Sequence, residues 1–448
     1  MTKPKLNGRQ LFFIGSMLFG LFFGAGNLIF PVFLGQEAGT NLWPALLGFL
    51  ISGVGLPLLG VIAIGVSHTD GVFQLAKKVA PWYGYFFTIV LYLCLGPLFA
   101  TPRLATISYE IGMQPFIGQQ TQPALFVYAL VFFGIAWWFS RKPSKIMDYV
   151  GKFLTPAFLV ALGALLMMAL VKPLGHGQAA HGVYATDPLV NGFTAGYFTM
   201  DALAALAFGI IVVNAIKQLG VTQPGQIARD TVKSGAIAIV IMAILYGLLA
   251  LLGRNALGPF ARATNGGPIL ANVASAYFGE FGQVLLAIIV ILACLKTAIG
   301  LITAFGDTMT ELFPRLPYQG VVFVASLLPV IIANVGLDQL LLFSTPMLYF
   351  LYPLAITLIL LGLLSPIFGQ SRWLMGAVTY LTVPAALLDA LQSLPASLHT
   401  GWVAQVLSVG RYLPGFDFGL GWMLPALIGL IIGLILARTF DRQPKALT

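Results

Sequence analysis

Apolar residues run along this chain in long, nearly continuous stretches that short polar segments separate. A helix that crosses a bilayer needs about 20 consecutive, mostly apolar residues. Twelve stretches predict such helices, at residues 11–36, 42–66, 83–108, 123–140, 150–171, 193–217, 231–253, 281–311, 319–336, 338–363, 372–395 and 419–438. The strands of a membrane β-barrel alternate apolar and polar positions instead. The pattern therefore predicts an all-α polytopic membrane protein with twelve transmembrane helices.

Composition and charge agree with a protein that is embedded in the lipid bilayer. Hydrophobic residues make up 59% of the chain and charged residues 8%, and the mean hydropathy is +0.94. If the N-terminus is cytoplasmic and the loops alternate, most of the 23 Lys and Arg residues lie on the cytoplasmic side. Such an excess marks cytoplasmic loops. We therefore expect both termini in the cytoplasm, and we attribute the net charge of +9 to these loops rather than to a nucleic-acid partner.

The first apolar stretch has an unusual middle, LFFGAGNLIFP, at residues 21–31. Glycine weakens a helix, and the amide of Asn27 finds no partner in hydrocarbon. We predict that the helix unwinds near residues 23–27, which frees N–H groups on its outer half and carbonyl groups on its inner half. The N–H groups favour a carboxylate and the carbonyls a small hard cation. The alternative is a close contact between helices through small residues.

A similar polar, Gly-containing middle returns in the sixth stretch, five spans later. Because five is an odd number, the second copy would enter the membrane upside down, as in transporters built from inverted repeats. We predict a first repeat at residues 11–171, a second at residues 193–363, and two additional helices within residues 372–438.

Two of these stretches contain charges at membrane depth. Asp201 lies about a third of the way into the sixth stretch, and an intramembrane carboxylate indicates function. Alternatively, Asp201 lies near the outer water interface or pairs with Arg103. Lys296 lies in the middle of the eighth stretch, on a narrow face of small and polar residues, and should pair with an acid such as Asp201 or with backbone carbonyls. A buried lysine of this kind can exchange a proton during a cycle.

The third stretch ends with Arg103 and, two turns later, Glu110. We favour a structural ion pair or a gate for these residues over direct contact of Arg103 with a substrate, which stays the alternative.

No nucleotide motif G-x-x-x-x-G-K-[ST] indicates a pump. A channel would need a continuous polar stripe, whereas the polar residues here cluster at one depth. A membrane enzyme would need an acid–base or metal constellation, and the four histidines lie at loops or span ends.

Five segments together resemble the bacterial branched-chain amino acid:cation symporter family, the BrnQ-type carriers: LFFGAGNLIFP, GPLFATPR, TISYE, GYFTMDALAALAFG and ACLKTAIGL. The resemblance runs over essentially the whole chain. It implies a single transporter domain with the LeuT-like inverted-repeat fold of the amino acid–polyamine–organocation superfamily, with discontinuous helices 1 and 6. It also implies uptake of leucine, isoleucine and valine with a cation across the bacterial cytoplasmic membrane, without a cofactor and without enzyme activity.

The resemblance further implies roles for individual residues. The N–H groups of Gly24, Ala25 and Gly26 would bind the substrate carboxylate, with Asn27 as an ion or hydrogen-bond ligand. The substrate amine and side chain would meet the sixth helix at Thr199, Met200, Asp201 and Ala202, with Phe208 as a wall of the aliphatic pocket. The second sodium site of the fold would consist of the carbonyls of Gly20, Phe23 and Ala293 and the hydroxyl of Thr297.

Lys296 departs from the family pattern, in which we expect a hydroxyl or a small apolar residue at this position. An ammonium there would stand where the sodium ion stands. We therefore hypothesise sodium-independent or proton-coupled transport. The alternative is that Lys296 points to another partner and Na⁺ still binds. Other open possibilities are a carrier for another small neutral solute, such as a nucleobase, and a sodium-independent amino acid exchanger.

Overall fold

The computed structural model describes residues 6–67, 69, 71–117, 122–368 and 371–440, in which the regular elements are helical and a lone bridge joins Leu257 and Phe260. The elements of the first half are α1 (Gly8–Phe22), α2 (Ala25–Ala38), η1 (Gly39–Asn41), α3 (Leu42–Leu50), η2 (Ile51–Gly55), α4 (Leu56–Val66), α5 (Val72–Lys77), α6 (Pro81–Leu93), η3 (Cys94–Leu98), α7 (Ala100–Gly112), α8 (Gln114–Ile117), α9 (Gln122–Ser140), η4 (Pro143–Lys145), η5 (Met147–Leu154) and α10 (Thr155–Val171). Those of the second half are α11 (Val183–Thr186), α12 (Pro188–Ala195), η6 (Gly196–Thr199), α13 (Asp201–Gln218), α14 (Pro224–Asn255), α15 (Gly266–Phe278), α16 (Glu280–Leu312), α17 (Tyr318–Ala333), α18 (Leu337–Phe368), α19 (Arg372–Gln392), η7 (Ala396–Leu398), α20 (Trp402–Gly410), η8 (Phe416–Phe418) and α21 (Met423–Phe440).

The predicted all-α membrane class is confirmed. In the described part of the chain, 10 helical segments are long and apolar enough to cross a membrane, and α1 and α17 are shorter apolar helices. One of the 10 segments, Ala25–Val66, joins half of the first predicted span to the whole of the second. Each of the twelve predicted ranges contains helix, but the number of membrane crossings and the bounds of the two repeats remain predictions.

The first and sixth predicted spans are each divided into two helices. α1 ends at Phe22, and α2 begins only after the extended backbone of Gly24. In the sixth span, α12 continues into the 3₁₀ turn η6, and the chain reverses its helical sense at Met200 before α13 begins. The predicted discontinuous helices are therefore confirmed, with both breaks in the polar, small-residue segments that suggested them.

A close crossing joins α2 to α14. A Cβ atom on Gly35 would lie 1.9 Å from the backbone oxygen of Ala250, and one on Gly253 would lie 1.9 Å from that of Val32. Only glycine allows two helix backbones to approach so closely, which is how small residues promote helix packing in membranes. The second half of the first span, α2, is thus held directly against α14 of the seventh.

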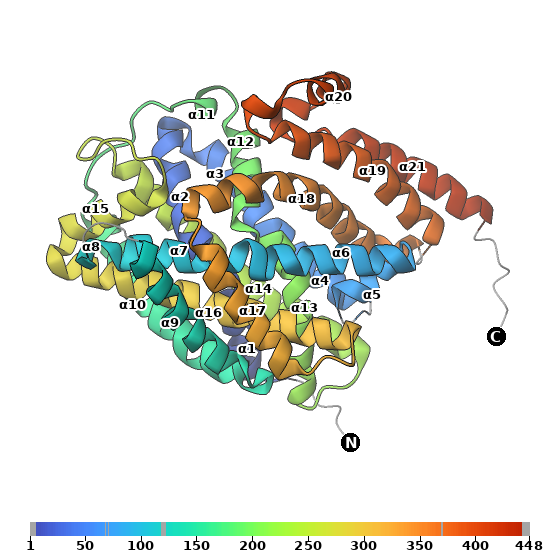
Figure 1. Ribbon diagram of the computed structural model, residues 1–448, viewed down its shortest axis with the longest axis horizontal. Helices are drawn as coiled ribbons and strands as arrows, with labels where there is room; N and C mark the ends of the chain where they lie inside the picture. Colours follow the sequence, from blue (N-terminus) through green and yellow to red (C-terminus); the bar gives the residue numbers. More distant parts are fainter. Residues whose placement is uncertain (1–5, 68, 70, 118–121, 369–370, 441–448) are drawn as a thin grey trace.

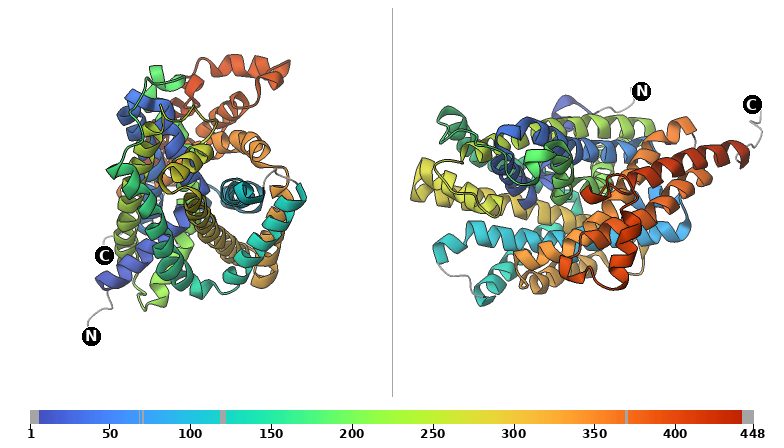
Figure 2. Two further views of the ribbon diagram at one scale, coloured as in Figure 1. Left: turned by 90° about the vertical axis from the view of Figure 1, so that its left-hand side faces the viewer. Right: turned by 90° about the horizontal axis from the view of Figure 1, so that it is seen from above.

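Figures 1 and 2 show α19 and α21 packed on each other along one edge of the molecule, next to α18. α21 is mostly exposed, with apolar side chains such as Ile431 and Ile435 on its surface, as expected of a helix that faces lipid. By contrast, α13 and α16 are mostly buried within the bundle. The two added C-terminal helices therefore lie outside the central group of α1, α2, α7, α13 and α16, which contains the charges discussed below.

Candidate functional site

The interruption between α1 and α2 leaves backbone polar groups inside the protein. The amide oxygen of Asn27 accepts the N–H of Gly24 at 2.8 Å and so caps α2. The N–H groups of Ala25 and Gly26, in the first turn of α2, have no acceptor among the described residues. They carry the partial positive charge of a helix N-terminus. Of the three N–H groups predicted to meet a carboxylate, that of Gly24 is thus already used by Asn27.

The second break places a strained residue beside the first. Met200 has φ 62° and ψ 13°, the left-handed conformation, and no other non-glycine residue in the described ranges has a positive φ. Such a backbone costs of order 1–3 kcal/mol and persists only where its surroundings enforce it. The hydroxyl of Thr199 donates to the carbonyl of Gly196 at 2.8 Å and accepts the N–H of Asp201 at 3.4 Å. The turn therefore fixes the start of α13 and the direction of its first carboxylate.

Side chains from the two breaks meet at that carboxylate. Asp201, which is 1% exposed, accepts hydrogen bonds on Oδ2 from Asn27 Nδ2 and from the hydroxyl of Tyr246, each at 2.7 Å. Asn27 Nδ2 also contacts the hydroxyl of Tyr246. Sequence reasoning missed Tyr246, a lone phenol in the apolar seventh span, because aromatic residues are common in membrane helices. The network joins α2, α13 and α14, and among the residues that the structure describes no cation forms an ion pair with Asp201.

Lys296 on α16 reaches back to the break in the first span. Its ammonium, which is fully buried, donates to the carbonyl of Gly20 at 3.1 Å and to that of Phe23. The hydroxyl of Thr297 lies 3.4 Å from the same Gly20 oxygen. The structure therefore brings together four of the five residues predicted for the cation site. Ala293 lies one turn earlier on α16, and in the described part of the chain no hydrogen bond joins its carbonyl to the ammonium.

Three phenylalanine rings surround this ammonium. The nitrogen lies 4.4 Å from the ring centre of Phe158, 5.6 Å from that of Phe23 and 5.7 Å from that of Phe19. A cation over a ring face in a desolvated place gains about 2 kcal/mol or more. Among the described residues no acid forms an ion pair with Lys296, so the alternative of a salt bridge to Asp201 is not formed. Carbonyls and rings take the place of an acid.

A cavity of about 30 Å³ lies between the two breaks. It is lined by nearly all the residues predicted to contact a substrate, namely Gly24, Ala25, Gly26, Asn27, Thr199, Met200, Asp201 and Phe208. Ala202 is the exception: it is buried but does not line the cavity. Other lining residues, which the sequence did not single out, include Leu21, Phe22, Leu95, Leu104, Ala204 and Leu301. A ligand pocket typically measures about 300–1,000 Å³, so this cavity is closed around little more than a water-sized space.

Arg103 also lines this cavity, which corrects one prediction. The expected ion pair with Glu110 is not formed, because the two residues lie two turns apart on α7 and have different neighbours. Arg103 donates from Nη2 to the carbonyl of Phe198 at 3.0 Å and lies over the ring of Phe30. Glu110 instead lines a separate cavity of about 510 Å³ with Asn265. A role of either residue in gating stays a prediction.

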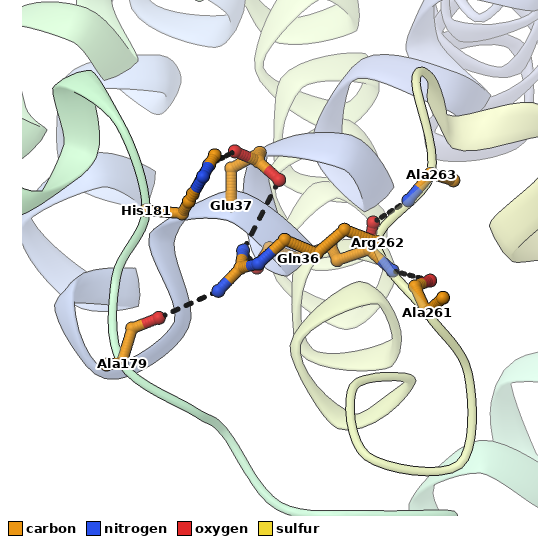
Figure 3. Close-up of polar contacts among 7 residues, drawn as sticks. All are labelled: Gln36, Glu37, Ala179, His181, Ala261, Arg262 and Ala263. Atoms are coloured by element: carbon orange, nitrogen blue, oxygen red, sulfur yellow. Dashed lines mark hydrogen bonds and ion pairs between the residues drawn. The ribbon is translucent and has the colours of Figure 1, made fainter.

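The far end of α2 is tied to two loops by a second polar group, the Glu37 cluster (Gln36, Glu37, His181 and Arg262; Figure 3). The carboxylate of Glu37 lies 2.8 Å from His181 Nδ1 and 3.3 Å from Arg262 Nη1. Arg262 Nη2 donates to the carbonyl of Ala179 at 3.0 Å, and Gln36 Oε1 accepts the N–H of Ala263 at 2.8 Å. One half-helix is therefore held at both ends, by a buried network at Asn27 and by a partly exposed one at Glu37.

The family of the chain follows from comparison with known proteins. The family model described as branched-chain amino acid transport protein matches residues 7–440. The chain belongs to this family. It is 46% identical to the branched-chain amino acid permease BrnQ of Lactobacillus delbrueckii subsp. lactis over 434 residues, which cover 95% of this chain and 96% of that protein. These proteins are named as transporters and not as enzymes.

Further members of the branched-chain family are similar over nearly their full length. The permease BrnQ of Bacillus subtilis is 42% identical, covering 97% of this chain and 98% of that protein. The branched-chain amino acid transport system 2 carrier protein of Pseudomonas aeruginosa is 39% identical, covering 98% and 99%. The chain is thus a multi-pass membrane protein of a family of branched-chain amino acid carriers.

Solved structures show the fold. Mhp1, a nucleobase-cation-symport-1 family transporter, in a closed conformation with bromovinylhydantoin bound, aligns with a TM-score of 0.56 at 12% identity, covering 97% of this chain and 94% of that chain. The inward-facing conformation of Mhp1 aligns with a TM-score of 0.58, also at 12% identity, covering 100% and 97%. The predicted LeuT-like fold is therefore confirmed. At this identity the likeness concerns the fold alone.

Proposed function

We propose that this protein is a secondary active transporter that imports leucine, isoleucine and valine across the bacterial cytoplasmic membrane, with both termini in the cytoplasm. The names of its relatives, which are branched-chain amino acid permeases and carriers, support this substrate class. The observation that carries the proposal is the meeting of the two broken helices at Asn27 and Asp201. The N–H groups of α2 suit the carboxylate of a zwitterion, and Asp201 suits its ammonium. The surrounding lining is apolar, which suits an aliphatic side chain.

We further propose that the carrier works by alternating access. The cavity of about 30 Å³ is too small for an amino acid, so α1, α2 and α13 must separate from α7 and α16 to admit one. The first, second, sixth and seventh spans would rock against the third, fourth, eighth and ninth. The glycine crossing supports this division, because Gly35 and Gly253 hold α2 against α14. The helices α2 and α14 would then move as one body.

The position of Lys296 bears on which cation gradient drives transport. Lys296 donates to the carbonyls of Gly20 and Phe23, the groups that the family resemblance assigns to a sodium ion. An ammonium at this position repels a second cation, so we propose that Lys296 replaces the ion and that transport does not need Na⁺. A proton gradient is then the proposed source of energy, with Lys296 as the group that gains and loses the proton. An exchanger that needs no gradient is the second candidate, since a permanently charged Lys296 would serve equally as a fixed cation.

Uptake of radiolabelled leucine into liposomes that contain the purified protein tests the proposal. Four conditions are needed: an inward sodium gradient, an inward proton gradient, neither gradient, and neither gradient with leucine preloaded inside. Accumulation with the proton gradient alone supports proton coupling, and accumulation only after preloading supports exchange. Accumulation that requires sodium would overturn the proposed role of Lys296. No leucine uptake by folded protein in any condition would overturn the substrate class itself.

A further inference from the structure

Arg103 is the second buried cation near the helix breaks, and its bonding differs from that of Lys296. Its side chain is 4% exposed and lines the central cavity. Only Nη2 has a hydrogen-bond acceptor, the carbonyl of Phe198. Nε and Nη1 are buried and have no partner among the described residues. A guanidinium has five N–H donors, so most of the donors of Arg103 remain available.

The guanidinium of Arg103 lies beside the first turn of α2. Arg103 Nη2 lies 3.4 Å from the position that a Cβ atom on Gly26 would occupy. Gly26 belongs to the first turn of α2, where its N–H and that of Ala25 have no acceptor in the described ranges. A helix N-terminus and a guanidinium are each suited to bind a carboxylate, and here both line the same small cavity.

The charged groups in and near the cavity also favour an anion. Lys296 and Arg103 contribute two cations, and Asp201 contributes one carboxylate whose Oδ2 already accepts two hydrogen bonds. In the described part of the chain no acid lies within ion-pair distance of Arg103. A buried charge is costly unless it is paired. We propose that Arg103 binds the carboxylate of the transported amino acid, together with the N–H groups of Ala25 and Gly26.

This inference rests on the proposed function and adds a specificity rule to it. The substrate has to carry a free carboxylate, and the amino alcohol or amide of the same side chain is a poor ligand. The competing role for Arg103 is structural: its bond to Phe198 fastens α7 to the turn before α13. The two roles differ in their dependence on the ligand, because a structural arginine affects all ligands alike.

Equilibrium binding of leucine and of leucinol to the purified full-length protein separates these roles. Leucinol keeps the amine and the side chain but replaces the carboxylate by a hydroxymethyl group. We expect Arg103→Gln to weaken leucine binding by at least about tenfold, the loss of one hydrogen bond between charged groups. We expect its affinity for leucinol to change less than about threefold. Arg103→Lys keeps the charge without the planar fork and should give an intermediate loss for leucine only.

Thr106→Val is the matched control, because Thr106 lies one turn later on α7 and its buried hydroxyl donates only to the carbonyl of Arg103. It should bind both ligands as the wild type does. Equal loss of leucine and leucinol binding in both Arg103 variants, or unchanged leucine binding in Arg103→Gln, would overturn the inference. If the wild-type protein binds no leucine at all, the proposed function fails instead.

Discussion

Two cations are buried near the broken helices, and their surroundings differ. Lys296 has two backbone carbonyls and three aromatic rings around its ammonium. Arg103 has one carbonyl and one ring, and two of its three nitrogens have no hydrogen-bond partner within the described ranges. The comparison indicates that burial alone does not define a binding residue. A cation whose donors are satisfied by the fold, like Lys296, is held in place by the protein, whereas one with donors left over, like Arg103, is placed for a ligand.

The largest expected effect comes from removing Lys296, the cation whose donors have acceptors within the protein. Lys296→Thr leaves the carbonyls of Gly20 and Phe23 without their donor and opens room for an ion. We expect leucine uptake without sodium to fall at least about tenfold, since hydrogen bonds to charged groups contribute about 1.5–3 kcal/mol each. Added sodium should restore uptake, because the carbonyls and the new hydroxyl can bind it. Uptake by proteoliposomes across a series of sodium concentrations measures this.

Lys172→Thr, a change at an exposed lysine at the end of α10, provides the matched control and should leave uptake unchanged. If Lys296→Thr transports leucine normally and shows no response to sodium, Lys296 does not stand in for the ion.

The second effect concerns thermal stability and sharpens the difference between the two cations. Each unpaired buried carbonyl costs about 1–3 kcal/mol. Lys296→Met should therefore destabilise the ligand-free protein more than Arg103→Gln, because it removes a donor from two carbonyls instead of one, and only the carbonyl of Gly20 keeps a second donor, the hydroxyl of Thr297 at 3.4 Å. Leucine at about 100 times its dissociation constant should stabilise the wild type by about 2.7 kcal/mol, and Arg103→Gln much less at the same concentration. Melting curves in detergent, with and without leucine, measure both. A larger loss of thermal stability for Arg103→Gln than for Lys296→Met, measured without leucine, would contradict this difference between the two cations.

A third prediction tests Asp201, the carboxylate at which the two helix breaks meet. Tyr246→Phe removes the hydroxyl that donates to Asp201 but keeps the ring that packs against Phe23 and Phe49. Losing one hydrogen bond to a charged group, about 1.5 kcal/mol, should weaken leucine binding by roughly tenfold. Tyr128→Phe is the matched control, because that hydroxyl donates to Ser108 away from the cavity. Equal effects of the two variants would show that Asp201 does not depend on Tyr246 for binding.

The aromatic rings predict a smaller effect. A double-mutant cycle of Lys296→Met with Phe158→Leu should give a coupling energy of about 1 kcal/mol, within the range of cation–π contacts. The corresponding cycle of Arg103→Gln with Phe30→Leu should give less, because the distance from the cation to the ring centre is 5.7 Å instead of 4.4 Å. Unfolding midpoints of the single and double variants provide the values. A larger coupling energy for Arg103 with Phe30 than for Lys296 with Phe158 would contradict the view that Lys296 is the cation held more firmly by the fold.

The smallest effect is expected at the Glu37 cluster, which contains partly exposed charges. Glu37→Gln weakens its contacts to His181 and Arg262, and exposed ion pairs typically contribute about 0–1 kcal/mol. We expect the initial rate of leucine uptake to stay within about threefold of the wild type. A tenfold change would mean that the C-terminal end of α2, at Glu37, controls transport as strongly as its N-terminal end does.

Several features of the site were readable from local sequence. The Gly24–Asn27 segment and the segment around Met200 each combine glycine or polar residues with an apolar flank, and both proved to be helix breaks. Lys296 and Asp201 stood out because charges are costly in a membrane. Arg103 stood out as well, but its proximity to Glu110 in the sequence suggested a pairing that the structure does not contain. Spacing along one helix indicates a shared face and not which neighbour that face meets.

The sequence by itself determines the membrane environment, the helical class and the places where helices break. A chain in lipid must satisfy its backbone hydrogen bonds within each helix. A break therefore needs glycine or polar residues at that point, and these are visible in the local sequence. The partners of the buried charges depend on the tertiary structure. Lys296 meets carbonyls 273 and 276 positions earlier in the chain, and Asn27 meets a carboxylate 174 positions later. Such contacts arise from how helices cross, at points such as Gly35 and Gly253. The residue pattern within one helix does not determine where that helix crosses another. Only the folded protein therefore shows that the donors of Lys296 have acceptors while most donors of Arg103 do not, within the part of the chain that the structure describes.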